Sequence, residues 1–244
     1  MLVLGGSLGT SRAVWDGIAA GLAGQYRLLR FELPGHGGAP SPPGPYTVGQ
    51  LGAAVLALLE RHGIERVAYC GISLGGMIGM WLAARAPARV DALGLVCTSA
   101  YLPPAEGWLS RAEQVMAHGM GSVREQSIGR WFTSALARRE PGLIARFGDD
   151  LERIDPAGYA GCCGAIAEMD LRPALSAIAA PTLVIAGSED PATPPSHGAR
   201  IAAGIAGARL LVVRGAAHLA TASHPAQVGA ALSAHVRAAT GRSA

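Results

Sequence analysis

The stretch that decides the fold is Gly71-Ile72-Ser73-Leu74-Gly75, a serine with a glycine two residues away on each side. It lies between an apolar run at residues 67–70, which predicts a buried strand, and a helical pattern at residues 74–86. A sharp strand-to-helix turn projects a serine hydroxyl away from the sheet, and the glycines let neighbouring backbone approach closely. Ser73 is therefore the candidate nucleophile. Because glycine is abundant here, the alternative is a tight turn in a Rossmann-like protein.

Working outward, apolar runs alternate with helical patterns through the first hundred residues. The predicted strands are residues 2–4, 26–33, 67–70 and 90–97, and the predicted helices are residues 12–22, 48–59 and 74–86. This rhythm indicates a mostly parallel sheet with helices on both faces. It resumes late in the chain, with strands at residues 182–186 and 210–213 and helices at residues 196–205 and 225–239.

Residues 101–178 show helical periodicity without a convincing strand. We expect helices at residues 106–118, 123–138, 143–154 and 158–168. An all-helical insertion in an α/β chain commonly covers the active site. The sequence thus predicts one catalytic core, residues 1–100 and 179–244, with a helical lid at residues 101–178.

The partners of Ser73 are expected directly after the later strands. Asp190 follows the strand at residues 182–186, and the adjacent Glu189 could replace it. His218 follows the last strand and is the candidate base, with His224 as its rival. In the chain order serine, aspartate, histidine, His218 would take the proton of Ser73 and Asp190 would hold the imidazole in the correct tautomer.

The glycine-rich loop at residues 5–10 is the candidate second half of an oxyanion hole. We expect the backbone N–H of Leu8 to act together with that of Leu74. The competing interpretation is a phosphate-binding loop, but the stretch matches neither a Walker A pattern nor a full dinucleotide fingerprint.

Composition excludes several other classes of protein. The formal net charge is +3 with no basic block, which argues against nucleic-acid binding. All 20 cationic residues are arginine, so lysine-based covalent chemistry is excluded. The four cysteines lack metal-ligand spacing, and no signal peptide or membrane span is apparent. We expect a cytoplasmic protein with a small-molecule substrate and no metal or cofactor.

With the triad in place, the chain resembles the 3-oxoadipate enol-lactonases of aromatic catabolism, a group within the α/β-hydrolase superfamily. The stretches that carry the likeness are residues 7–10, 71–79, 97–100, 130–133, 158–163, 185–190 and 216–219. The resemblance implies the α/β-hydrolase fold and opening of 3-oxoadipate enol-lactone by water to 3-oxoadipate, in the β-ketoadipate pathway, without cofactor or metal.

The resemblance also raises questions about recognition. Trp131 would pack on the lactone ring, or else be an aromatic of the lid core. The substrate carboxylate needs a cationic partner, for which Arg130, Arg146 and Arg153 of the lid are equal candidates.

In one respect the chain departs from the group. Its members usually begin with an antiparallel pair of strands that we expect to be missing here, which would expose a sheet edge and leaves the oligomeric state open.

Other functions remain open on the same fold. The chain could be a general carboxylesterase, another lactonase or a cofactor-free haloperoxidase-like hydrolase, because fold does not fix substrate. It could also be a ligand-binding protein that has lost turnover.

Overall fold

In the computed structural model, which describes residues 1–241, six strands form one sheet in the order β2-β1-β3-β4-β5-β6. Every pairing within this sheet is parallel. The strands are β1 (Leu2–Gly5), β2 (Leu28–Arg30), β3 (Val67–Ile72), β4 (Val90–Val96), β5 (Thr182–Gly187) and β6 (Arg209–Val213). The antiparallel strands found in the resembling group do not occur among the described residues, and β2 and β6 form the two edges.

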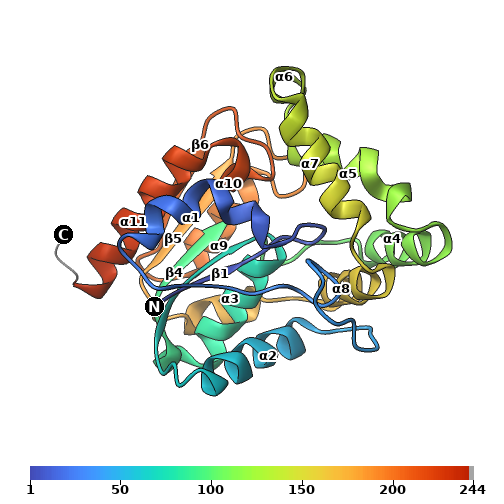
Figure 1. Cartoon of the computed structure of the whole chain (residues 1–244). Coiled ribbons are helices and arrows are strands. Elements are labelled where there is room, and N and C mark those ends of the chain that lie inside the picture. The colour runs from blue at the N-terminus through green and yellow to red at the C-terminus, as the bar shows by residue number, and fades with distance from the viewer. Residues whose placement is uncertain (242–244) are drawn as a thin grey trace.

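Helices cover both faces of the sheet, as expected (Figure 1). These are α1 (Asp16–Ala23), α2 (Val48–Arg61), α3 (Leu74–Arg85), α9 (Pro195–Gly204), α10 (Ala220–Ser223) and α11 (Pro225–Thr240), with short 3-10 helices η1 (Arg12–Trp15), η2 (Pro87–Arg89) and η4 (Arg172–Ala177). Helices α1 and α11 pack together on one face, and α2 and α3 pack on the other. The strands β1, β3 and β5 are buried throughout because both of their faces are covered, which explains their uninterrupted apolar runs.

Local sequence sets where these elements begin. Helix α2 starts at a capping box in which the Thr47 hydroxyl accepts from the Gln50 N–H at 3.0 Å. The Gln50 side chain accepts in return from the Thr47 N–H at 2.8 Å. The strand expected at residues 26–33 is shorter, only Leu28–Arg30. The Tyr26 N–H still donates to Leu22 O in the last turn of α1, so it cannot join the sheet.

Between β4 and β5 the described chain contains helices and no strand. Besides η4, they are α4 (Ala105–His118), η3 (Met120–Val123), α5 (Arg124–Trp131), α6 (Ser134–Arg139), α7 (Pro141–Glu152) and α8 (Pro156–Glu168). Helix α4 packs on α8 and α5 packs on α7, and the group lies beside the core (Figure 1). The single helix expected at residues 123–138 is wrong. Phe132 is extended, and the Thr133 hydroxyl caps a new helix by accepting from the Leu136 N–H.

Within residues 1–241, none of the helices combines the length and the apolar character that crossing a membrane would require. The buried core instead runs continuously from the sheet into the helices between β4 and β5.

Candidate active site

Ser73 sits at the turn between β3 and α3 in a backbone conformation that L-residues rarely adopt. Its φ is 54° and its ψ is −118°, and its side chain is almost buried. The Ser73 N–H donates to Val96 O at 3.0 Å, and the Thr98 hydroxyl donates to Ser73 O at 2.7 Å. These two bonds, to the last residue of β4 and to the loop that follows it, hold the strained residue in place. Strain of this kind is associated with functional sites.

The glycines around Ser73 are required by close backbone packing. A Cβ on Gly71 would lie 2.2 Å from the carbonyl carbon of Gly75, and a Cβ on Gly75 would lie 2.4 Å from Gly5 O. The Gly75 N–H donates to Gly6 O at 2.9 Å. The loop after β1 therefore rests directly on the turn that carries Ser73.

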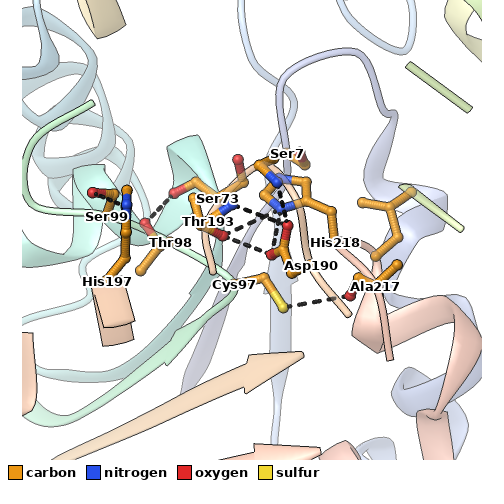
Figure 2. A network of polar contacts seen from close by, with 12 residues as sticks. Ser7, Ser73, Cys97, Thr98, Ser99, Asp190, Thr193, His197, Ala217 and His218 are labelled. Atoms are coloured by element: carbon orange, nitrogen blue, oxygen red, sulfur yellow. Dashed lines mark hydrogen bonds and ion pairs between the residues drawn. The ribbon is translucent and has the colours of Figure 1, made fainter. Parts of the chain in front are cut away.

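Asp190 and His218 meet at the carboxyl ends of β5 and β6. Asp190 Oδ2 lies 2.8 Å from His218 Nδ1 and accepts from the Thr193 hydroxyl at 2.7 Å (Figure 2). Asp190 Oδ1 accepts from the N–H groups of Ala192 and Thr193 at 2.8 and 3.0 Å. Glu189 is exposed and does not contact the imidazole, so of the two candidate carboxylates the structure brings Asp190 to His218.

This environment keeps Asp190 charged. Burial raises its pKa, but the charge of His218, the hydrogen bond to its ring and the bonds from Thr193 more than offset that effect. The pKa of Asp190 falls from 3.8 to about 2. An ionised carboxylate can only accept, so it keeps a proton on Nδ1 and leaves Nε2 as the proton acceptor.

Each of the two expected oxyanion donors has a backbone N–H without an acceptor among the described residues. Leu74 is the first residue of α3, where its N–H has no acceptor in a preceding helical turn. The Leu8 N–H has no acceptor in the described part of the chain, and Leu8 lines the same cavity as Ser73.

His36 supports this site through the loop after β1, and sequence reasoning missed it. Its ring is fully buried and stacks on Tyr159, and its Nε2 accepts from the Gly9 N–H at 3.0 Å. Its Nδ1 lies 2.8 Å from Pro34 O, which can only accept, so the proton is on Nδ1. Burial, partly offset by the bond to Pro34, lowers the pKa of His36 to about 4. The neutral ring thus anchors the loop that carries Leu8. The sequence feature that could have drawn attention to His36 is its position between two glycines, Gly35 and Gly37.

The end of α5 is bonded to the histidine loop. The His218 N–H donates to Arg130 O at 3.4 Å and the Leu219 N–H donates to Trp131 O at 3.1 Å. The helices between β4 and β5 therefore help to position the candidate base.

The candidate nucleophile and the candidate base border one small cavity of about 40 Å³. Ser73 and His218 both line it, together with Leu8 and Trp131. Trp131 is buried, its ring meets Phe147 edge-on, and a Cβ on Gly9 would lie 2.9 Å from it. The tryptophan thus borders the cavity and also packs on the candidate oxyanion loop.

The three candidate arginines separate in the structure. Arg130 lines the cavity, whereas Arg146 and Arg153 are exposed and face Asp16 and Asp150 at 3.9 and 3.6 Å.

Arg111 also lines the cavity, and sequence reasoning missed it. The sequence feature that could have indicated its burial is that Arg111 precedes Val115 by four residues, which places both on the buried face of α4.

The described residues contain no group of three or more histidine, cysteine or acidic side chains suited to a metal ion. Cys97 lies beside the triad, donating to Ala217 O at 3.8 Å, but burial and then the charge of Asp190 raise the pKa of its thiol. A thiol with a raised pKa is a poor nucleophile, so Ser73 remains the candidate nucleophile of the cavity.

Comparisons with known proteins place the chain in a family and give its relatives. Residues 1–225 match the family described as the alpha/beta hydrolase fold. The chain is 35% identical to 3-oxoadipate enol-lactonase 2 of Acinetobacter baylyi, covering 92% of this chain and 84% of that protein. It is 31% identical to a pimeloyl-[acyl-carrier protein] methyl ester esterase of Neisseria meningitidis, covering 88% and 85%. The crystal structure of the enol-lactonase from Burkholderia xenovorans LB400 superposes with a TM-score of 0.94 at 36% identity, covering 96% of this chain and 90% of that one.

Proposed function

The chain belongs to the α/β-hydrolase fold family, and from that premise we propose that it is a serine hydrolase which opens 3-oxoadipate enol-lactone with water to give 3-oxoadipate. The observation that carries the proposal is the shared cavity of Ser73 and His218, with Asp190 bonded to the far side of the imidazole. Similarity to enol-lactonases over most of both chains favours this substrate. The proposal includes a place in aromatic-compound catabolism and in the cytoplasm.

The proposed reaction begins with attack of the Ser73 hydroxyl oxygen on the lactone carbonyl, while His218 Nε2 takes the hydroxyl proton. The N–H groups of Leu8 and Leu74 stabilise the resulting oxyanion. The ring C–O bond then breaks, and His218 returns the proton to the departing enol oxygen. The enol relaxes to the ketone, still attached to Ser73 as an ester.

Water completes the proposed reaction. His218 takes a proton from a water molecule, the hydroxide attacks the acyl carbon, and the proton passes to the Ser73 oxygen as the ester bond breaks. Helices α4 to α8 act as the lid in this account, because Trp131 and Arg130 border the cavity from that side.

A methyl ester or simple carboxylic ester is the second candidate substrate. It is favoured by the likeness to the pimeloyl-[acyl-carrier protein] methyl ester esterase. Both candidates require the same triad, so the difference lies only in recognition.

The test compares kcat/KM for the enol-lactone with that for 4-nitrophenyl and methyl esters of matched length. We expect a strong preference for the lactone, and a loss of at least about 10³-fold in its turnover for Ser73→Ala. A preference for the esters would assign the chain to the esterases. Normal turnover by Ser73→Ala with the fold intact would rule out the serine mechanism.

A further inference from the structure

Arg111 is a buried cation whose partners are all neutral. Its side chain donates to the Tyr159 hydroxyl at 2.7 Å, to the Ser127 hydroxyl at 2.6 Å and to the Gln126 side-chain oxygen. Burial raises the pKa of Tyr159 to about 12, although Arg111 opposes the shift, so the phenol is uncharged at neutral pH. A buried charge without an opposite charge is destabilising unless a ligand supplies one.

Arg130 places a second cation beside the first. It is half-buried, and its guanidinium has neither an ion pair nor a hydrogen bond within residues 1–241. Burial, and then the charge of Arg111, lower the pKa of Arg130. By contrast, Arg124 and Arg153 on the neighbouring elements each pair with carboxylates. Among residues 1–241, every other arginine without a carboxylate partner is exposed to solvent, whereas Arg111 is buried and Arg130 is half-buried.

The two arginines lie between the cavity of Ser73 and an open groove on the surface. Arg111 and Arg130 line the cavity of Ser73 and His218, and both also line an adjoining groove of about 600 Å³. The groove continues along Gln114 and the loop before α9. Residues that line both hollows mark their boundary, so an anion entering along the groove would meet the guanidinium groups before the carbonyl reached Ser73.

We propose that Arg111 and Arg130 form an anion subsite of the cavity, which holds a carboxylate carried by the substrate while Ser73 attacks a carbonyl on the same molecule. The inference rests on the proposed hydrolase function and deepens it. It specifies the substrate class as lactones or esters with a free carboxylate group. The planar guanidinium fork matches a carboxylate, and the unused N–H donors of both side chains are available for it.

The test uses two 4-nitrophenyl esters, mono-4-nitrophenyl adipate with a free carboxylate and 4-nitrophenyl methyl adipate, in which methylation removes that charge. The wild type should prefer the anionic ester. Arg130→Gln should lower the ratio of the two kcat/KM values by about 10-fold to 100-fold, mainly through KM, because a charged hydrogen bond is lost. Arg130→Lys should restore part of the ratio. The matched control is Arg138→Gln on the exposed side of α6, which should leave the ratio unchanged.

A binding measurement separates this proposal from the proposed reaction. Calorimetry with adipate on Ser73→Ala should detect binding that Arg130→Gln weakens by a similar factor, with thermal unfolding confirming that both variants fold. Arg111→Lys keeps the charge but loses the fork geometry. It should lower the affinity for adipate by less than Arg130→Gln does.

Two results would overturn the subsite. One is an unchanged ester ratio in Arg130→Gln while hydrolysis still depends on Ser73, which would leave the reaction intact. The other is unchanged adipate affinity in the Ser73→Ala background. Hydrolysis by Ser73→Ala would instead overturn the reaction, and the adipate affinities would still decide the subsite.

Discussion

The loops at the carboxyl ends of the strands and the helices between β4 and β5 build the site in different ways. In the loops, backbone contact is so close that single glycines are required, as Gly71 and Gly75 show. In the helices, side chains line the cavity: Arg111 donates only to neutral groups, and Arg130 has no hydrogen-bond partner among the described residues. The difference suggests that reactivity is fixed by the backbone of the core and recognition by exchangeable side chains of the helices.

The largest expected effect lies in the core, at the carboxylate. Asp190→Asn should lower kcat by roughly 10³–10⁴-fold, because the amide can donate to Nδ1 and so favours the wrong tautomer. Glu189→Gln, one residue earlier and exposed, is the matched control and should have little effect. Steady-state kinetics on both variants checks this. Equal losses would mean that the two carboxylates are interchangeable and that the core is less rigid than we describe.

The next effect concerns His36, which links the core loop to the helices through Tyr159. Its pKa is about 4 in the folded protein against the ordinary 6.5, so between these values only the unfolded chain binds the proton. The free energy of unfolding should therefore fall as the pH drops through that window, by about 3 kcal/mol in total from this residue. Above pH 6.5 this residue contributes no pH dependence.

The variant His36→Gln isolates that contribution. It keeps an acceptor for the Gly9 N–H but cannot titrate, so its stability should fall less steeply with acid. Urea unfolding at roughly pH 7.5 and pH 4.5 measures the difference. If the free energy of unfolding changes equally with pH in both proteins, His36 takes up protons in the folded state as it does in the unfolded chain.

Glycine substitutions sharpen the comparison directly. Gly75→Ala should destabilise the protein by about 1–3 kcal/mol and reduce turnover, because its Cβ would lie 2.4 Å from Gly5 O. Chemical unfolding combined with kinetics would detect both effects. A stable and fully active Gly75→Ala variant would contradict the rigid description of the core.

The smallest effect should have the opposite sign. Gly129, in α5, has open space around its Cβ position, so Gly129→Ala should stabilise by about 0.5–1 kcal/mol through helix propensity. A modest rise in Tm with unchanged kcat is the expected result. A fall in Tm would show that this helix tolerates change no better than the core does.

The same division explains what could be predicted from sequence. The parallel sheet, its covering helices and the family were predictable, because buried strands are continuous apolar runs and Gly71-Ile72-Ser73-Leu74-Gly75 has few structural uses. The break between α5 and α6 was not, because Phe132 and Thr133 continue a helical pattern while adopting extended backbone.

Two residues around the cavity, Arg111 and His36, were not predictable from the sequence. Arg111 is distant in sequence from every motif, and its importance depends on burial and on the neutral character of its partners. His36 acts through the backbone of Gly9, 27 residues earlier. Such contacts arise from tertiary packing, which a single sequence does not specify.

The central claim is that the strained serine after β3 is activated by the imidazole after β6. A fluorophosphonate probe followed by mass spectrometry of the labelled peptides tests it without assuming any substrate. We predict one adduct, on Ser73, that is absent from Ser73→Ala and forms far more slowly on His218→Gln. An adduct on a different residue, or undiminished labelling of His218→Gln, would contradict the account.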